Sequence, residues 1–178
     1  MTSSDQSLHA LAFLPYINDH GMLPEQFQGQ VGVYAIFDKA KTLQCIGYSR
    51  DVYASLQQHL VRQPDRCYWL KVHTIDRPQR AILEAIRDCW IAEYGAVPPG
   101  NGPEQALWHD PIDAKPTMSA DEKLAYESAP DDMTRSKLLK TVARRLEAQI
   151  LDALQARGVK MPIRFNPKLK DNGLLDLK

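Results

Sequence analysis

Residues 31–48 read Val31-Gly-Val-Tyr-Ala-Ile-Phe37, Asp38-Lys-Ala-Lys41 and Thr42-Leu-Gln-Cys-Ile-Gly-Tyr48. The first and last segments are rich in β-branched, aromatic and other apolar residues, which predicts two strands. The polar segment between them is typical of a turn. Two such strands joined by a short turn pair as an antiparallel hairpin.

The residues that follow extend the hairpin into a β-β-α-β-α unit. After Asp51, a good helix N-cap, apolar residues recur at helical spacing as far as Pro64. Residues 67–75 predict a third strand, and after Asp76 the spacing predicts a long helix that Gly95 ends. We therefore expect an α+β fold, with a small three-stranded antiparallel sheet flanked by helices and a C-terminal helical extension.

The chain divides into four parts on this interpretation. Residues 1–30 form an N-terminal extension, 31–102 the α+β domain, 103–132 an acidic linker or excursion, and 133–178 a C-terminal helix and tail. The helix is predicted over residues 134–157, because apolar side chains there step by four. These are Leu138, Val142, Leu146, Ile150 and Leu154.

The overall charge argues mildly against tight nonspecific DNA binding. Lys+Arg and Asp+Glu number 22 each, so the net charge is zero, whereas proteins that bind DNA through phosphates are often strongly basic. The balance is uneven along the chain. Residues 110–132 carry seven acids against two lysines, and residues 136–170 carry nine basic residues against two acids. Most such blocks are solvated faces, and phosphate contact is the minority interpretation.

The cysteines and the lengths of the apolar segments indicate the cellular compartment in which we expect the protein. Cys45, Cys67 and Cys89 form no C-x-x-C pair and lie in apolar runs, so we expect buried, reduced thiols. Reduced thiols suit the cytoplasm, where we expect the protein. No apolar stretch approaches the roughly 20 residues of a membrane span, and the polar start lacks the pattern of a signal peptide.

Short motifs in residues 31–101 resemble those of the GIY-YIG nuclease superfamily. Two strand motifs stand ten residues apart, and a helix, a strand and a second helix with a central glutamate follow in the family's order. The resemblance implies a GIY-YIG-like fold. The residues that carry it are Gly32-Val33-Tyr34, Cys45-Ile46-Gly47, Arg50-Asp51, His59, Glu84 and Pro98-Pro-Gly-Asn101.

The resemblance also implies metal-assisted hydrolysis of a phosphodiester. Tyr34 matches the first tyrosine of the family, and Glu84 matches the glutamate that holds a divalent cation, usually Mg²⁺. Cys45 and Ser55 stand where the family has a second tyrosine and an arginine. Without that guanidinium, the site lacks a bidentate partner for the charge that develops on the phosphate. We therefore expect a DNA endonuclease relative with weakened or lost activity, so its status as an enzyme stays open.

Three hypotheses remain. The first is a GIY-YIG protein that still binds DNA or another nucleic acid, with Arg50, His59, Arg144 and Arg145 as candidate contacts. The second is a protein-binding or scaffold module on the same fold, with the C-terminal helix and tail as the partner surface. The third is an active nuclease whose site is rearranged around Tyr48 and Arg50. Tyr34 and Glu84 are explained equally well as structural residues.

Overall fold

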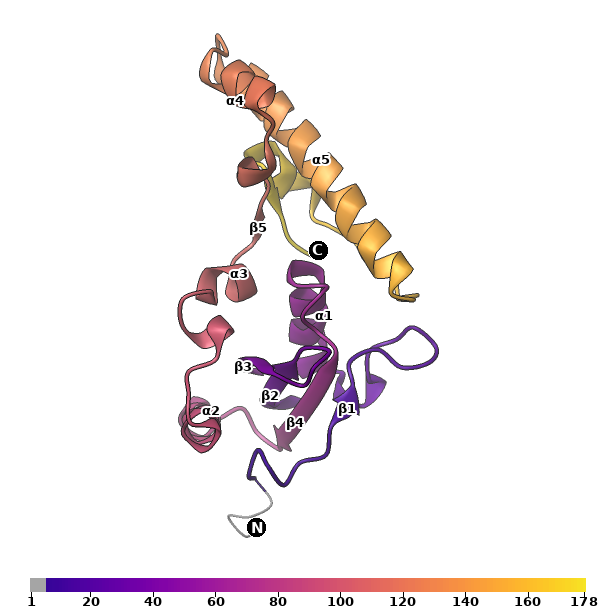
Figure 1. Ribbon diagram of the computed structural model, residues 1–178, viewed down its shortest axis with the longest axis vertical. Helices are drawn as coiled ribbons and strands as arrows, with labels where there is room; N and C mark the ends of the chain where they lie inside the picture. The colour runs from indigo at the N-terminus through magenta and orange to yellow at the C-terminus, as the bar shows by residue number, and fades with distance from the viewer. Residues whose placement is uncertain (1–5) are drawn as a thin grey trace. The chain divides into compact units, whose positions relative to one another are not determined.

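The computed structural model describes residues 6–178, which form two compact units. The first contains the described residues up to Asp110 together with Val159–Met161. The second contains Pro111–Gly158 and Pro162–Lys178. Figure 1 labels the elements of both units.

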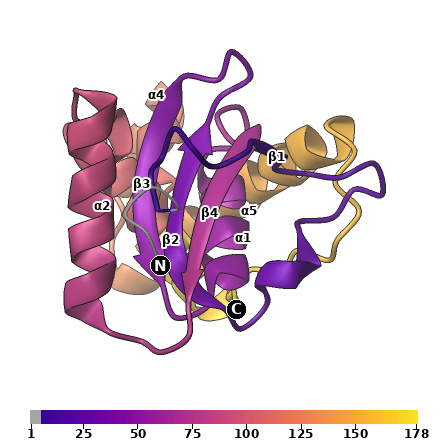
Figure 2. The ribbon, with the colours of Figure 1, turned by 90° about the horizontal axis from the view of Figure 1, so that it is seen from below.

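The first unit is built on one antiparallel sheet. Its strands are β1 (Leu14–Pro15), β2 (Val31–Phe37), β3 (Leu43–Ser49) and β4 (Trp69–Ile75), in the order β1-β4-β2-β3. Figure 2 shows β3 at one edge of the sheet. All three ladders are antiparallel. The predicted α+β class with an antiparallel sheet is therefore confirmed, and β1 adds a fourth strand that is too short to stand out in the sequence.

Two helices cover the two faces of this sheet. Residues in β2 alternate between the faces. Val33 and Ala35 pack in one core cluster with Leu83, Ile86 and Trp90 of α2 (Arg80–Tyr94). The residue between them, Tyr34, contacts α1 (Val52–Arg62) through His59.

The ends of these helices follow local sequence signals. The carboxylate of Asp51 accepts a hydrogen bond from the Ala54 N–H and caps α1, as predicted. Gly95 ends α2 with a φ of 87°, a left-handed conformation that favours glycine. Helix α2 begins at Arg80 rather than directly after Asp76. The unit also contains η1 (Glu25–Phe27), η2 (Pro99–Asn101) and α3 (Gln105–His109).

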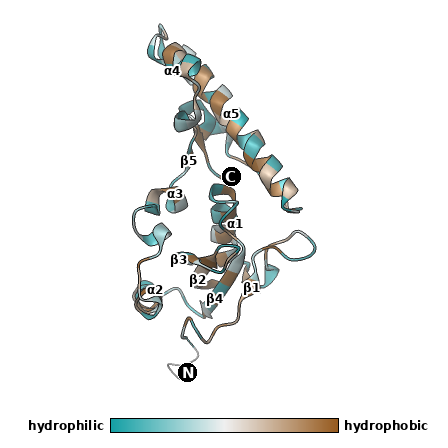
Figure 3. Ribbon diagram, in the orientation of Figure 1, coloured by the Kyte–Doolittle hydropathy of each residue, from teal (hydrophilic) through white to brown (hydrophobic). Residues whose placement is uncertain are grey.

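The second unit is organised by the long helix α5 (Asp132–Ala156), along which hydrophilic and hydrophobic residues alternate in Figure 3. The tail packs on α5, with Gly173 against Leu139, and it pairs as a short strand with residues 112–113. Its apolar side chains thus serve the interior of this unit. The remaining elements are β5 (Ile112–Asp113), η3 (Lys115–Thr117), α4 (Ala120–Glu127), η4 (Pro167–Asn172) and β6 (Leu174–Leu175).

None of the helices within residues 6–178 is both long enough and apolar enough to cross a membrane.

Candidate functional site

Tyr34 lies inside the first unit rather than on a solvent-facing surface. Its side chain is 2% exposed, and its Oη lies 2.8 Å from Nε2 of His59. Its ring passes beneath Gly47, where an added Cβ would lie 2.6 Å from Cζ of the tyrosine. Burial raises the pKa of Tyr34 far above its ordinary value. The hydroxyl is therefore a neutral structural group and is unsuited to the role of a base.

Glu84 lies on the opposite side of the sheet. Its Oε1 accepts hydrogen bonds from Nε of Arg80 at 2.7 Å and from Oη of Tyr48 at 3.0 Å. The hydrogen bond from Arg80, assisted by Tyr48, lowers the pKa of Glu84. The carboxylate is thus charged and paired. Since Tyr34 points toward α1 and Glu84 projects from α2, the structure does not bring these two predicted site residues together.

The α1 side of the sheet holds a buried polar cluster around Tyr34. Burial lowers the pKa of His59 to about 3, so its imidazole is neutral at pH 7. Burial also raises the pKa of Cys45 to about 12, and its Sγ lies 3.8 Å from Nε2 of His109. Ser55, at the expected arginine position, hydrogen-bonds to Oγ of Ser49 at 2.8 Å. Tyr34, Cys45 and His59 are buried and neutral, which leaves no ionised nucleophile among the three.

An open, basic surface lies around Tyr48 instead. Two concavities of about 290 and 330 Å³ share Tyr48 as a lining residue, and we call them together the Tyr48 groove. Of the described residues that line it, three are arginines and none is Asp or Glu. The lining residues are Ile46, Gly47, Tyr48, Ser49, Arg50, Pro78, Arg80, Leu83, Arg87, Asn101, Gln105 and His109.

The arginines reach the groove from two elements. Arg80 and Arg87 project from the same side of α2 because they are two turns apart. The guanidinium of Arg87 lies 5.4 Å from the ring centroid of Tyr48, a cation–π contact that holds both side chains. Arg50 is exposed at the end of β3. The sequence predicts Tyr48 and Arg50 as site residues but not Arg80 and Arg87, although the helical spacing of these two arginines on either side of Glu84 was a usable signal.

Asn101 closes the edge of the sheet next to the groove. Its Oδ1 accepts a hydrogen bond from the Ile46 N–H at 2.7 Å, and its Nδ2 donates to the Ile46 carbonyl at 2.6 Å. One side chain thus satisfies both outward backbone groups of an edge-strand residue. This contact fixes β3, and with it the neighbouring Tyr48.

The other predicted nucleic-acid contacts lie elsewhere. His59 is buried in the α1 cluster and cannot touch a ligand in the groove. In the second unit, Arg145 is held by Glu122 at 2.6 Å and by the Thr117 carbonyl at 3.2 Å, whereas Arg144 is exposed. Only Arg50 of the four candidates therefore lines the Tyr48 groove.

A magnesium site at Glu84 stays a prediction, and its surroundings do not favour it. Within residues 6–178 no group of three or more His, Cys, Asp or Glu side chains is placed to hold a metal ion. The carboxylate of Glu84 is already paired with Arg80. Mg²⁺ is bound through carboxylate oxygens, so the competing guanidinium disfavours a cation at this position.

The chain is similar to one part of a larger plant protein. No family model matches the sequence. Over 74 residues, the chain is 42% identical to the chloroplastic bifunctional monothiol glutaredoxin-S16 of Arabidopsis thaliana. The match covers 39% of this chain and 25% of the relative, so the chain spans about a quarter of the length of the curated relative it matches.

This comparison contradicts the predicted membership of the GIY-YIG superfamily and the predicted endonuclease function, because the relative is named as a glutaredoxin. The structure gives physical reasons for the short motifs that suggested the assignment. An added Cβ at Gly32 would lie 2.5 Å from the His73 carbonyl oxygen, and Gly47 makes room for Tyr34. Both glycines are required by close packing within the sheet, whatever the chemistry of the protein.

Proposed function

We propose that the Tyr48 groove binds the phosphate groups of a nucleic acid. The observation that carries the proposal is that Arg50, Arg80 and Arg87 line one open surface whose described lining residues include no Asp or Glu. A guanidinium presents a planar fork of N–H donors that matches a phosphate. Phosphate contacts of this kind position a protein on a nucleic acid without reading its sequence.

The pairing of Glu84 with Arg80 does not use up the basic character of the groove. The side chain of Arg80 is 82% exposed, so its remaining N–H groups face solvent. Arg87 is 30% exposed, pairs through Nε with Asp88 at 2.9 Å and is oriented by Tyr48. Because the whole chain has no net charge, the attraction is local. We therefore expect micromolar rather than nanomolar binding, since few phosphates are contacted.

Binding to fluorescently labelled oligonucleotides, single-stranded and duplex, tests this proposal. Replacing Arg80 and Arg87 with glutamine should weaken binding at least tenfold, because two charge-assisted contacts are lost. Arg144→Gln provides the matched control, since Arg144 is an exposed arginine in the second unit. Equal affinities for the wild type and the Arg80/Arg87 variant would show that the groove is not the binding surface.

A second candidate function is thiol–disulfide exchange, which the name of the relative favours. Cys89 is the exposed thiol, whereas Cys45 and Cys67 are buried. Activated thiols are found at helix N-termini or beside cations, but Cys89 lies in the middle of α2 and follows Asp88. This candidate therefore ranks second. If the wild-type protein reduces a small mixed disulfide and the Cys89→Ser variant does not, thiol–disulfide exchange would rank above phosphate binding.

We also propose that the protein works in a compartment that keeps thiols reduced, such as the cytoplasm. All three cysteines are thiols rather than disulfides. Buried thiols such as Cys45 and Cys67 are compatible with a reducing environment. A fusion to a fluorescent protein, viewed in the native cell, tests this location.

A further inference from the structure

The outer edge of β3 carries one open pair of backbone groups in the Tyr48 groove. In the antiparallel ladder with β2, Ile46 and Tyr48 lie two residues apart with no register shift between them. The N–H and the carbonyl of Ile46 both bond to Asn101, so they point away from β2. Residues two apart in such a strand point their backbone groups to the same side. The N–H and the carbonyl of Tyr48 therefore also point outward, at the edge where Tyr48 lines the groove.

The backbone pair of Tyr48 has no partner within the part of the chain that the structure describes. Asn101 covers Ile46, but no residue of 6–178 is hydrogen-bonded to the N–H or the carbonyl of Tyr48. The phenol hydroxyl of Tyr48 bonds to Glu84 on the α2 side and leaves the strand edge free. Unpaired backbone groups at a sheet edge are ready to pair with another molecule. A ligand at this edge therefore gains two hydrogen bonds.

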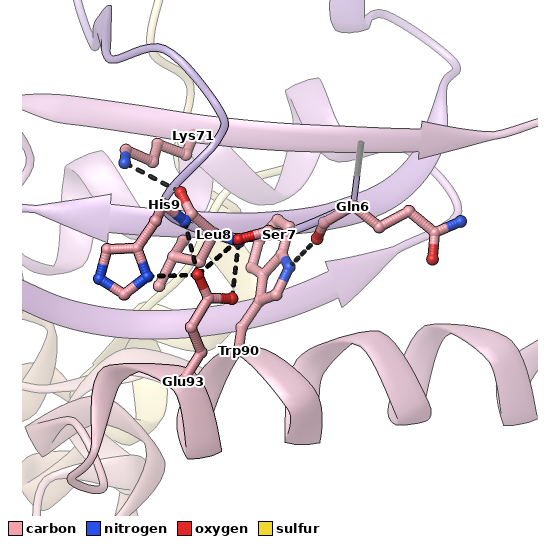
Figure 4. A network of polar contacts seen from close by, with 7 residues as sticks. All are labelled: Gln6, Ser7, Leu8, His9, Lys71, Trp90 and Glu93. Atoms are coloured by element: carbon pink, nitrogen blue, oxygen red, sulfur yellow. Dashed lines mark hydrogen bonds and ion pairs between the residues drawn. The ribbon is translucent and has the colours of Figure 1, made fainter. Parts of the chain in front are cut away.

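Side chains close such backbone groups elsewhere in the first unit, at the start of the described chain (Figure 4). Glu93 accepts hydrogen bonds from Oγ of Ser7 at 2.6 Å and from the backbone N–H groups of Leu8 at 2.9 Å and His9 at 2.8 Å. Lys71 donates to the Leu8 carbonyl at 2.9 Å. Burial alone would raise the pKa of Glu93, but these hydrogen bonds outweigh it and lower the pKa to about 2. The open pair on β3 differs from this pattern.

Asn101 shows which chemical group fits a backbone pair of this kind. Its amide presents a carbonyl oxygen to the N–H of Ile46 and an N–H to the carbonyl of Ile46. Thymine and uracil contain the same arrangement, since the O4 oxygen lies beside the N3–H group. Bases in single strands are recognised through these Watson–Crick edges, which are occupied by the partner base in a duplex. The pair at Tyr48 can therefore accept an unpaired base as Ile46 accepts Asn101.

The surroundings of the open pair favour a nucleotide over a peptide strand. Arg50 follows Tyr48 by two residues and Arg87 contacts its ring, so groups that bind phosphate lie beside the pair. His109 is exposed in the same concavity, and unpaired bases stack on rings of this kind. A peptide that adds a strand to a sheet uses several consecutive backbone pairs, whereas Asn101 already occupies the neighbouring one.

We propose that the Tyr48 groove binds single-stranded nucleic acid by pairing one unpaired base with the N–H and the carbonyl of Tyr48. The proposal rests on phosphate binding by the arginines of the groove and adds to it the recognition of a base. Every nucleobase carries an acceptor next to a donor on its Watson–Crick edge. The backbone pair therefore selects for unpaired bases rather than for a sequence.

The test compares the binding of two fluorescently labelled single strands to the full wild-type chain. One is an oligothymidylate. The other has the same length and carries a methyl group on N3 of every thymine, which removes the donor but keeps the phosphates and the rings. Two hydrogen bonds of ordinary strength correspond to about a tenfold change in Kd, so the methylated strand should bind about tenfold more weakly. In NMR spectra, the backbone amide signal of Tyr48 should shift with oligothymidylate and not with the methylated strand.

Two substitutions at Tyr48 provide a matched comparison on the protein. Both Tyr48→Leu and Tyr48→Pro lose the phenol ring and its contact with Arg87. Leucine keeps the backbone N–H, so Tyr48→Leu should still distinguish the two strands. Proline lacks this N–H and is tolerated at an edge where the group faces outward. Tyr48→Pro should therefore bind the two strands with similar, weak affinity.

Three results would overturn the proposal. Equal affinities of the wild-type protein for the two strands would refute base pairing but leave phosphate binding intact, since the Arg80/Arg87 variant tests that separately. Binding of neither strand would refute both. A Tyr48 amide signal that shifts with a short extended peptide and with neither strand would assign the edge to strand addition instead. These measurements on the wild-type chain do not depend on whether Tyr48→Pro folds.

Discussion

Replacing Gly47 with alanine should destabilise the first unit, although alanine is ordinarily the better residue in a strand. Relative to glycine, alanine favours a strand interior by about 0.5–1 kcal/mol. Here the new methyl would lie 2.6 Å from Cζ and 2.8 Å from Cε2 of Tyr34. Carbon atoms prefer separations of about 3.5–4.0 Å, so ring and methyl must separate by roughly 1 Å.

The tyrosine has little freedom to make that movement. Tyr34 is 2% exposed and lies 2.8 Å from Nε2 of His59, so moving its ring disturbs that hydrogen bond. Overpacking a core costs about 1–3 kcal/mol, and a lost hydrogen bond costs about 1 kcal/mol. With the intrinsic preference for alanine subtracted, we therefore expect Gly47→Ala to lower the free energy of unfolding by about 1–3.5 kcal/mol in urea titrations.

A double-mutant cycle with Tyr34→Val isolates the contact. Valine removes the ring, so Gly47→Ala should cost at least about 1 kcal/mol less in that background than in the wild type. The shared background controls for the intrinsic preference of alanine. Additive free energies, or a Gly47→Ala protein as stable as the wild type, would refute the placement of Tyr34 beneath Gly47.

Four further predictions concern edge closure, acid stability at His59 and at Glu93, and thiol exposure. Asn101→Leu should cost about 2 kcal/mol of unfolding free energy, because the Ile46 N–H and carbonyl lose their partners; an unchanged melting temperature would contradict this. Because the pKa of His59 is lowered to about 3, the folded state does not take up the proton that the unfolded chain binds below pH 6.5. Stability should therefore fall by about 1.4 kcal/mol per pH unit below pH 6.5 until about pH 3. Titration of His59 near pH 6.5 by NMR would argue against its burial. The pKa of Glu93 is lowered from 4.5 to about 2, so its ionised carboxylate stabilises the fold at pH values above 4.5, and this contribution is lost as the pH falls toward 2. The Glu93→Gln variant should therefore lose less stability than the wild type between pH 4.5 and pH 2. Finally, an excess of a thiol reagent should modify Cys89 rapidly and the other cysteines only on unfolding. Equally fast modification of all three cysteines would contradict the burial of Cys45 and Cys67.

The sheet was predictable because its signals are local. The β-rich segments of 31–48, the short turn and the N-cap at Asp51 act over a few residues, and the structure contains the hairpin and helix that they predict. The two-residue strand β1 was not predictable, since it forms only by pairing with β4, far along the chain. Likewise, α3 lies in the segment that the sequence indicates as a linker, because it is too short to show periodicity.

The candidate site was harder to predict because it depends on which face each helix covers. The sequence alone is compatible with one site that contains both Tyr34 and Glu84. The alternation of side chains along β2 and the packing of α2 on the Val33 side place them on opposite faces. Arg80 and Arg87 join Tyr48 only through that same packing. Helical spacing indicates that the two arginines share a side of α2, but not which strand they face.

The salt dependence of oligonucleotide binding measures how many phosphates the Tyr48 groove contacts. Each phosphate neutralised on a single strand contributes about −0.7 to the slope of log K against log salt concentration. If Arg50, Arg80 and Arg87 each contact a phosphate, the wild-type slope should be about −2, and replacement of Arg80 and Arg87 with glutamine should reduce it to about −0.7. The Arg144→Gln protein should keep the wild-type slope. Slopes that are the same for the wild type and the Arg80/Arg87 variant would contradict phosphate binding in the Tyr48 groove.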